Sequence, residues 1–235
     1  MDILQQISEE KNKPKALPDR IYEELLRDIL TGRLRKDSRL NETKICQTYK
    51  ASRTPVREAF RRLEMDGLVE YIPNRGEFVR GLSQTEVDDM LLMRIELEVL
   101  AVQFSVERIT EEEEEELADI FKFMEFYTKK NDIQKMIDIN FAFHRLLYKS
   151  AHDKLLEKTL LAYHTYTNYC CPHNYFAPNY LKRVLAEHRR VYRAIMAKDS
   201  HAATDAMRVH MERTVKRSNQ ALKLVKPAEE EDYII

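Results

Sequence analysis

Apolar residues recur at helical spacing along most of the chain. In the N-terminal third, this spacing predicts helices over 20–30 and 42–49, and a third helix that starts at Thr54 and stops before Gly67. Only the segment 50–52 separates the second helix from the third. Such a short turn between two helices is typical of a helix-turn-helix.

Two short apolar segments follow the third helix. Residues 68–72 and 77–80 have the composition of strands, and Pro73-Asn74-Arg75-Gly76 between them is a turn signal. The pattern predicts a two-stranded hairpin after the helix-turn-helix. Such a hairpin is a wing, and Arg75 is expected near its tip.

The third helix has a dry face and a charged face. Thr54 is the expected N-cap, and Pro55 suits the first helical position because no donor is needed there. The backbone N–H groups at this helix start favour a phosphate, and Arg53 lies beside them. Arg57 and Arg61 share one face at i and i+4. The opposite, buried face carries Val56, Phe60 and Leu63.

Positive charge is concentrated around this helix. Residues 33–62 hold ten Lys and Arg against three Asp and Glu, a net charge of +7, whereas the whole chain has a net charge of −1. Alone, the patch is equally compatible with a solvated helix that carries scattered arginines. Together with the turn, the helix start and the wing, it favours binding to double-stranded DNA.

The rest of the chain is expected to be helical. A capping box over Ser83 to Glu86 opens it. The expected helices span 84–109, 111–129, 132–151, 154–170, 179–198 and 200–222. Thr110 is the expected cap of the second, whose six consecutive glutamates suit the helix dipole better than a metal site. Further expected caps are Asn131, Asp153 and Ser200.

Length and composition predict a mostly α protein with two domains, because the chain has 235 residues and only four glycines. The expected parts are a mobile arm (1–16), a winged helix-turn-helix (17–81), a helical domain (83–222) and a loose tail (223–235). No apolar run is long enough to span a membrane, and the start lacks the features of a signal peptide. Three cysteines do not form a disulfide framework. These features favour the cytoplasm, and adjacent Cys170 and Cys171 leave a minor redox or metal alternative open.

Three histidines occupy positions that can converge. His144 lies at i+4 from Asn140, so the two side chains share a helix face. His188 and His210 each lie eleven residues from Asp199, in the turn between the last two expected helices. In an antiparallel hairpin they sit level with one another. Three imidazoles and one oxygen suit a first-row transition metal, although each histidine also fits an ordinary core or surface position.

The N-terminal segment resembles the winged helix-turn-helix of GntR-type bacterial transcription regulators over about residues 17–81. Four strings carry the resemblance: Leu40-Asn41-Glu42, Ala51-Ser52-Arg53-Thr54-Pro55-Val56-Arg57-Glu58-Ala59, Leu63-Glu64-Met65-Asp66-Gly67-Leu68-Val69 and Asn74-Arg75-Gly76. The residues that it implies as contacts to bases and phosphates are Ser52, Arg53, Thr54 and Arg57. It also implies that Gly76 lets the wing approach the minor groove.

One position departs from the family pattern. Many members carry an arginine directly after the glutamate that starts the second helix, whereas here Thr43 follows Glu42. Lys44 comes next and is the expected substitute for a contact to DNA.

The C-terminal half resembles the FCD ligand-binding domain of the FadR-like subgroup of that family. Metal-binding members carry Asp-x-x-Phe-His, then Glu-His, then a further histidine; the matching segments are Asn140 to His144, Glu187-His188 and His210-Met211. The implied ligands of a divalent metal are Asn140, His144, His188 and His210. Because an amide replaces the acid, we expect weaker binding, with Zn²⁺ as the first candidate and Ni²⁺ or Mn²⁺ as alternatives.

Arg94 and a polar aromatic segment are the candidates for binding an effector. Arg94 lies among apolar residues, and a partly buried arginine commonly binds a carboxylate through two hydrogen bonds. The resemblance implies that an arginine here faces the effector cavity. The alternative is an ion pair with Glu98 at i+4. The segment 163–169, which includes Asn168, either lines a pocket for a polar ligand or lies on the surface.

Together these patterns predict a ligand-responsive transcriptional regulator, either a repressor or an activator. A homodimer is expected to bind a palindromic operator, and the helical domain a metal and a small carboxylate or sugar-acid effector. Two alternatives belong to other classes. One is a helical metal-dependent hydrolase with Glu187 as the base; the other is a structural DNA-binding protein without an effector.

Overall fold

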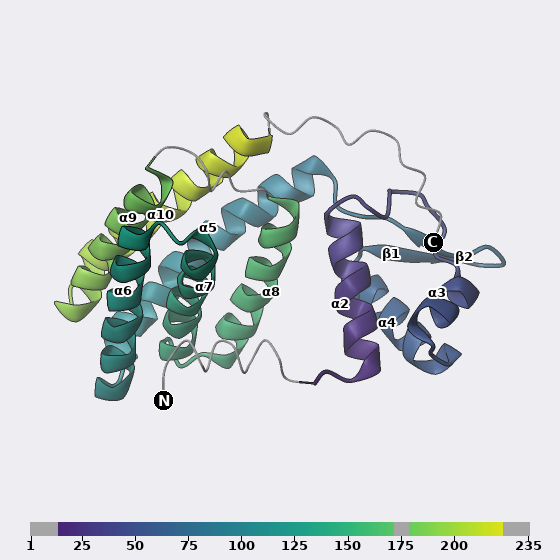
Figure 1. The fold of residues 1–235 in the computed structure, drawn as a ribbon, viewed down its shortest axis with the longest axis horizontal. Coiled ribbons are helices and arrows are strands. Elements are labelled where there is room, and N and C mark those ends of the chain that lie inside the picture. The colour runs from purple at the N-terminus through teal and green to yellow at the C-terminus, as the bar shows by residue number, and fades with distance from the viewer. Residues whose placement is uncertain (1–13, 172–178, 223–235) are drawn as a thin grey trace. The chain divides into compact units, whose positions relative to one another are not determined.

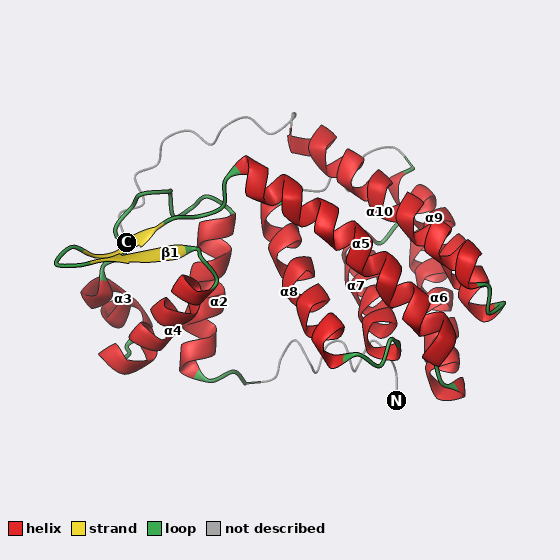
Figure 2. Ribbon diagram, turned by 180° about the vertical axis from the view of Figure 1, so that it is seen from behind, coloured by secondary structure: helices red, strands yellow, loops and turns green. Residues whose placement is uncertain are grey.

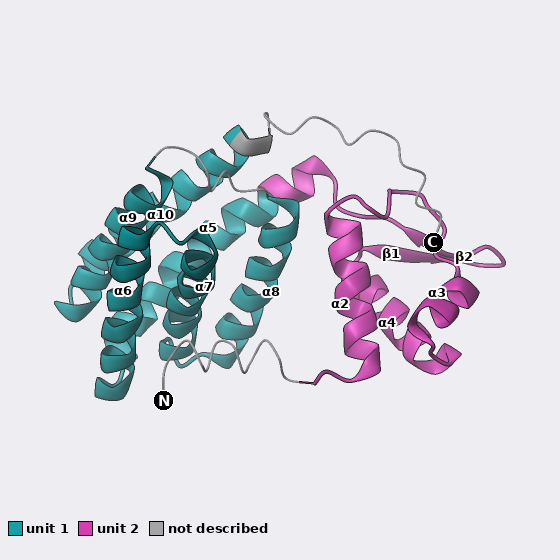
Figure 3. Cartoon of the chain, viewed as in Figure 1, with its two compact units in different colours: residues 1–12, 89–225 teal, residues 13–88, 226–235 magenta. Residues whose placement is uncertain are grey.

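The structure is a computed structural model that describes residues 14–171 and 179–222, and it divides into two compact units. In Figure 3 the first unit along the chain is magenta and extends to Asp88, and the second is teal and starts at Asp89. This division falls near the start of one long helix. The expected N-terminal arm up to residue 13 and the expected tail from residue 223 lie outside the described residues.

The first unit contains three helices and one two-stranded sheet (Figure 1). Its elements are α2 (Leu17–Leu30), α3 (Glu42–Tyr49), α4 (Arg53–Met65), β1 (Val69–Ile72) and β2 (Gly76–Val79). The helices meet through apolar side chains that are at most 2% exposed, among them Ile21, Leu25, Val56, Phe60 and Leu63. Burying this face anchors α4 on one side and leaves its opposite face in solvent.

The two strands form the wing. They pair in antiparallel register, with Val69 opposite Val79 and Ile72 opposite Gly76. Both valines are buried, which turns that end of the hairpin toward the core. The turn contains Asn74 with a φ of +63°, a left-handed conformation that asparagine tolerates. The predicted hairpin after the helix-turn-helix is therefore confirmed.

The second unit is entirely helical in its described part (Figure 2). Its elements are α5 (Gln84–Arg108), α6 (Glu111–Lys130), α7 (Ile133–Ser150), α8 (Lys154–Cys170), α9 (Tyr180–Met196) and α10 (Ser200–Leu222). A large apolar cluster joins α6, α7, α9 and α10 and includes Met124, Ile139, Leu147, Val191 and Met207. No helix in residues 14–171 or 179–222 is long and apolar enough to cross a membrane.

Two helix starts differ from the sequence prediction. Ser52, not Thr54, occupies the N-cap position of α4, so Thr54 lies inside the first turn. Proline is still accommodated next to it, because the first four N–H groups of a helix have no partner within the helix. Ser200 was also predicted as a cap, but it is the first residue of α10. Asp199 takes the capping role by accepting a hydrogen bond from the N–H of Ala202 at 2.9 Å.

The junction of α6 and α7 shows a third difference. Asn131 ends α6 in the left-handed conformation with a φ of +54°, and the neighbouring Asp132 caps α7 by accepting from the N–H of Lys135. Asparagine favours this helix-ending conformation, so the adjacent carboxylate becomes the cap. The other two predictions are confirmed: Thr110 forms a capping box at α6 and Asp153 caps α8.

Candidate nucleic-acid interface and metal centre

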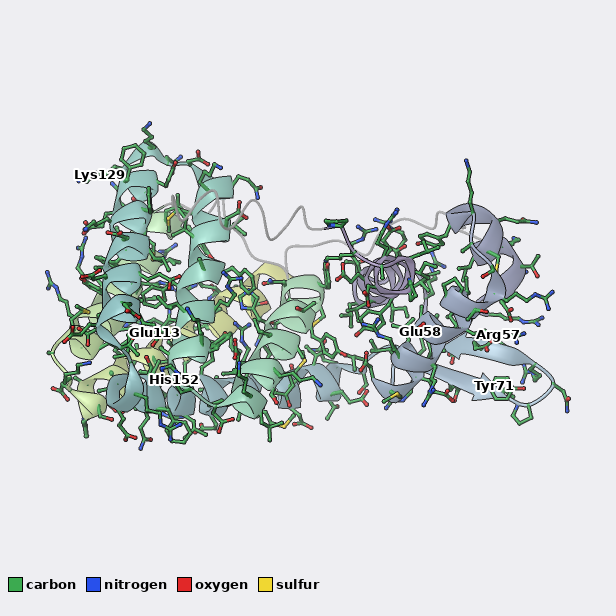
Figure 4. All side chains as sticks on the ribbon, turned by 90° about the horizontal axis from the view of Figure 1, so that it is seen from below. Arg57, Glu58, Tyr71, Glu113, Lys129 and His152 are labelled. Carbon is green, nitrogen blue, oxygen red and sulfur yellow. The ribbon has the colours of Figure 1, made fainter. Side chains whose placement is uncertain are left out.

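The exposed face of α4 carries the side chains predicted to contact DNA. Ser52, Arg53, Thr54, Arg57 and Arg61 are all exposed. Figure 4 shows Arg57 on this helix, beside Glu58. The opposite face is buried in the core, so the helix is anchored while its cationic side stays exposed to a polyanion.

Glu42 at the start of α3 orients two of these arginines. The Nε atom of Arg57 lies 3.1 Å from the Glu42 carboxylate, and that of Arg53 lies 3.6 Å from the same oxygen. Both arginines remain largely exposed, with 61% and 70% of their side chains accessible. Glu42 therefore limits their rotamers and leaves their outer N–H groups for a phosphate or base. Glu42 belongs to one of the family strings, but its sequence position alone did not indicate this role.

The remaining candidates lie on α3 and the wing, where Lys44 and Arg75 are exposed and Gly76 is half-buried. Lys50 ends α3 in the left-handed conformation that forms the tight turn, and Lys44 is exposed in the first turn of α3. Arg75 is exposed at the wing turn, with its guanidinium 5.2 Å from the ring of Phe78. Gly76 has a φ of +94°, a conformation that L side chains rarely adopt, so glycine is required there by backbone geometry alone.

In the second unit, three helices bring the three predicted histidines together. His144 comes from α7, His188 from α9 and His210 from α10, and one ligand atom of each lies within 4.8 Å of the others. All three side chains are buried, with exposures of 2%, 0% and 3%. No other group of three or more candidate metal-binding His, Cys, Asp or Glu side chains occurs in the described part of the chain.

Each of these imidazoles uses its Nδ1 atom to bind a protein acceptor. Nδ1 of His188 donates to the backbone carbonyl of Val184 at 2.9 Å. Nδ1 of His144 bonds to the Glu98 carboxylate at 3.0 Å, and Nδ1 of His210 bonds to the Glu187 carboxylate at 3.0 Å. Because carbonyls and ionised carboxylates only accept hydrogen bonds, the proton sits on Nδ1 and the Nε2 lone pairs are left over.

The three Nε2 atoms are then the available ligand atoms of the cluster. Those of His144 and His210 lie 3.3 Å apart, and that of His188 is buried without a hydrogen-bond partner among the described residues. Two nitrogens bound to one zinc ion at about 2.1 Å and a tetrahedral angle would lie about 3.4 Å apart. A carboxylate or carbonyl on the far nitrogen is the usual arrangement around a metal-bound histidine. The residues present therefore fit a transition-metal ion.

The charge state of the cluster suits such an ion. Burial lowers the pKa of His188 well below its usual range, and neighbouring His210 and His144 lower it further. Burial also lowers the pKa of His210, although its hydrogen bond to Glu187 partly offsets this effect. These imidazoles are therefore neutral at pH 7, which is the form that binds metals.

The carboxylates behind the histidines stay ionised. Burial raises the pKa of Glu98, but its pairing with His144 and Arg94 outweighs burial and keeps the pKa below the usual range. Burial likewise opposes ionisation of Glu187, yet hydrogen bonds from His210 and Arg217 lower its pKa to about 2. Neither acid had been predicted as a support for a histidine, because each lies on a different helix from the histidine it holds.

A cavity of about 80 Å³ opens beside the histidines. His144 and His210 line it together with Asn140, which lies one turn before His144. Asn168 also lines it, which favours the pocket interpretation of the polar segment over the surface interpretation. The size leaves room for several water molecules or a small organic ion.

Arg94 lines the same cavity and also forms the ion pair with Glu98 that was the alternative interpretation. Its guanidinium pairs with the Glu98 carboxylate at 3.1 Å, as the i+4 spacing predicted. It also donates to the hydroxyl of Thr167 and to Nδ1 of His164, the latter at 3.0 Å. Glu98 therefore links Arg94 on one side to His144 on the other, so the cavity wall and the histidine cluster share one carboxylate.

The adjacent cysteines gain no support as a metal site. The Sγ atoms of Cys170 and Cys171 lie 3.7 Å apart. The hydrogen bond between the thiols and burial raise the pKa of Cys170 far above its usual range, which keeps it as an unreactive thiol. Neither cysteine belongs to the metal-binding group found among the described residues.

Comparison with known proteins matches both units. Residues 17–79 match the family described as bacterial regulatory proteins, gntR family, and residues 89–213 match the FCD domain. The chain is 30% identical over 203 residues to YdhC of Bacillus subtilis (strain 168), an uncharacterized HTH-type transcriptional regulator, covering 85% of this chain and 89% of YdhC. It is 26% identical over 204 residues to the HTH-type transcriptional repressor RspR of Escherichia coli (strain K12), covering 86% and 88%.

A solved structure shows the same fold. E. coli McbR/YncC superposes with a TM-score of 0.68 at 22% identity, covering 89% of this chain and all of McbR/YncC (100%). A winged helix followed by an all-helical effector-binding domain defines a bacterial transcriptional regulator. The chain belongs to the GntR family, in the branch that carries an FCD domain.

The hydrolase alternative is therefore wrong, because this family consists of transcriptional regulators and not enzymes. The structure gives Glu187 a different task from that of a base. Its two carboxylate oxygens are taken up by His210 and by the guanidinium of Arg217.

Proposed function

We propose that this regulator binds a palindromic operator as a homodimer in the bacterial cytoplasm, one half-site per protomer. The single observation that supports DNA reading most directly is the exposed cationic face of α4, held against a fully buried opposite face. In this proposal the major groove receives α4. Its proposed contacts are Ser52, Arg53, Thr54, Arg57 and Arg61, with Lys44 from α3 and Arg75 and Gly76 from the wing.

We infer further that the histidine cluster holds a divalent transition metal. The support is the arrangement of the imidazoles: every Nδ1 is bound to an acceptor, and one ligand atom of each histidine lies within 4.8 Å of the others. Three imidazole nitrogens favour Zn²⁺, with Ni²⁺ or Mn²⁺ as alternatives. Asn140 is the proposed oxygen ligand, since it lines the cavity one turn from His144.

The effector proposed for the cavity is a small carboxylate or sugar acid. A bound metal would supply a fixed positive charge that anchors the effector oxygens. Arg94 and Asn168 line the same cavity and would hold the remaining polar groups of the effector. Arg94 is already fixed by Glu98 and Thr167, so it acts as a preorganised donor and needs little reordering on binding.

A metal titration tests the cluster. We expect Zn²⁺ to raise the melting temperature of protein stripped with EDTA, and His210→Gln to remove most of that rise. His201→Gln is the matched control, because His201 lies on the same helix with 90% of its side chain exposed. If Zn²⁺ stabilises the two variants equally, the metal is bound elsewhere.

A ligand screen tests the effector and the output together. Small organic and sugar acids would be screened by thermal shift with and without EDTA, and each hit would then be added to a fluorescence titration of a palindromic operator. We expect an effector to raise the melting temperature, EDTA to abolish that rise, and the same compound to change the operator affinity. If EDTA alters neither stability nor the ligand response, the metal-anchored effector is ruled out.

A further inference from the structure

A second concave surface lies between α9 and α10, which pack side by side (Figure 2). It is a groove of about 280 Å³ and is lined mainly by cationic side chains. Those side chains are Arg183, Arg190, Arg213, Lys216 and Arg217. The acidic residue in the lining is Glu187, so the groove carries a net charge of +4 on a chain whose overall charge is −1.

Glu187 neutralises only the inner wall of this groove. Both of its oxygens bind Arg217, at 2.8 and 2.9 Å, and Arg213 lies 3.6 Å from one of them. The same carboxylate is 95% buried and also bonds to His210. One carboxylate that is shared among three cationic or donor groups does not compensate Arg190 and Lys216.

The outer wall holds Arg190 from α9 and Lys216 from α10, both exposed. Within the part of the chain that the structure describes, neither forms an ion pair with a carboxylate. Several other arginines on these helices do: Arg189 binds Glu125 at 2.7 Å, and Arg208 binds Glu96. Like charges gathered in a concave surface repel one another and raise the local concentration of anions.

We propose that this groove, named the α9–α10 groove, binds a small multivalent oxyanion of the phosphate class at a site distinct from the histidine cavity. Guanidinium groups present planar pairs of N–H donors that match phosphate oxygens, and the groove offers several from two helices. Its volume accommodates an anion with two phosphate groups, which would meet Arg190 and Lys216 at the outer wall and Arg213 farther in.

Binding of the anion would also affect the histidine cluster, through two side chains. Arg217 lines both the groove and the histidine cavity, and Glu187 connects Arg217 to Nδ1 of His210. An oxyanion in the groove competes with Glu187 for Arg213 and Arg217. Glu187 then acts more strongly on His210. This second half of the inference rests on the proposed role of the histidine cluster, whereas anion binding itself does not.

Calorimetric titration of full-length, EDTA-treated protein with pyrophosphate tests the site without any metal. We expect saturable binding that sodium chloride at equal ionic strength does not reproduce. The double variant Arg190→Gln/Lys216→Gln should weaken binding at least about tenfold, since each lost cation removes charge-assisted hydrogen bonds. The control is Arg189→Gln/Arg208→Gln, which removes the same charge from the same two helices and should change affinity less than about twofold.

Three results would overturn anion binding. The first is a heat of binding that sodium chloride reproduces. The second is an equal loss of pyrophosphate affinity in the two double variants. The third is weaker operator affinity of the Arg190→Gln/Lys216→Gln variant in the absence of pyrophosphate. The last result would assign the groove to the DNA backbone.

The link to the histidine cluster is measured separately, by nitrogen NMR of the imidazoles in the metal-free protein. Pyrophosphate should shift the His210 signals and leave those of His201 in place; unshifted His210 signals with intact anion binding would overturn the link.

Discussion

At the scale of single residues, the histidine cluster depends on side chains that do not touch the metal position themselves. Glu187 and Glu98 each hold one imidazole by Nδ1 and one arginine on the other side. Each acid thus fixes a tautomer and also keeps an arginine paired, buried Arg94 in one case and half-buried Arg217 in the other. A buried charge without its partner is strongly destabilising. Loss of either acid should therefore lower both the metal affinity and the stability of the fold.

Replacing Glu187 tests that connection. Glu187→Gln keeps an oxygen that can accept from His210 but removes the negative charge, and we expect zinc affinity to fall about 10–100-fold. A competition titration with a chromophoric chelator measures this loss. Glu212→Gln, an exposed acid on the same helix as His210, should leave the affinity unchanged. Equal affinities for both variants would show that Glu187 supports only Arg217.

The lowered pKa values of His188 and His210 predict how the metal-free protein responds to acid. A histidine whose pKa is lower in the folded state binds fewer protons there than in the unfolded chain, where the pKa is about 6.5. The contribution of these two histidines to stability is therefore constant above about pH 7 and falls as the pH drops toward 5. Each histidine contributes up to about 1.4 kcal/mol per pH unit below 6.5.

Chemical denaturation of EDTA-treated protein at pH 7.5, 6 and 5 measures this slope. His188→Gln should make it shallower, whereas His201→Gln, on an exposed side chain, should not. A wild-type stability that is flat or rises between pH 7 and 5 would contradict the neutral, buried state of the two imidazoles.

The convergence of the histidines could be predicted at this scale, but their supports could not. His188 and His210 lie equally far from one turn, so antiparallel helices bring them level. Glu98 is 46 residues from the histidine it holds, and its i+4 spacing to Arg94 indicated an ion pair only. A second partner across the bundle depends on how α5 packs on α7, which hydrophobic spacing does not specify.

At the scale of elements, the core of each unit determines which helix face remains free. The first unit buries Val56, Phe60 and Leu63 of α4, and this leaves Arg57 and Arg61 in solvent. Periodicity alone predicted that division correctly, since the i, i+4, i+7 pattern is unambiguous in α4. The helix starts were predicted less well, because neighbouring Asn and Asp, or Asp and Ser, compete for the same capping position.

Arg57→Ala tests the exposed face of α4. We expect operator binding to weaken by about 1–3 kcal/mol if Arg57 reads a base. If it binds a phosphate instead, the plot of log affinity against log salt concentration should become shallower, with a slope smaller in magnitude by about one. Fluorescence anisotropy at several salt concentrations separates the two cases. Lys122→Ala on α6 removes an exposed charge far along the chain and should change neither the operator affinity nor its salt dependence. If the Arg57 variant also changes neither, α4 does not contact the operator through this face.

At the scale of the whole molecule, the proposed regulator must couple its two units. The effector would bind in the FCD domain and the operator at α4, and any influence of one on the other is a coupling free energy between two sites. Thermodynamics requires that influence to be reciprocal. Typical couplings of about 1–3 kcal/mol correspond to changes of about 5–150-fold in affinity.

Reciprocity therefore gives a prediction that holds whether the effector strengthens or weakens operator binding. Effector affinity would be measured by calorimetry with and without saturating operator, and operator affinity by anisotropy with and without saturating effector. The two ratios should agree, because both report the same coupling between the same two states. Asn168→Leu, which alters the cavity wall at an exposed position, should weaken effector binding yet leave operator affinity without effector unchanged. If saturating effector changes operator affinity but operator leaves effector affinity unaltered, the effector acts at a site other than the one measured, and the histidine cavity is not the control point.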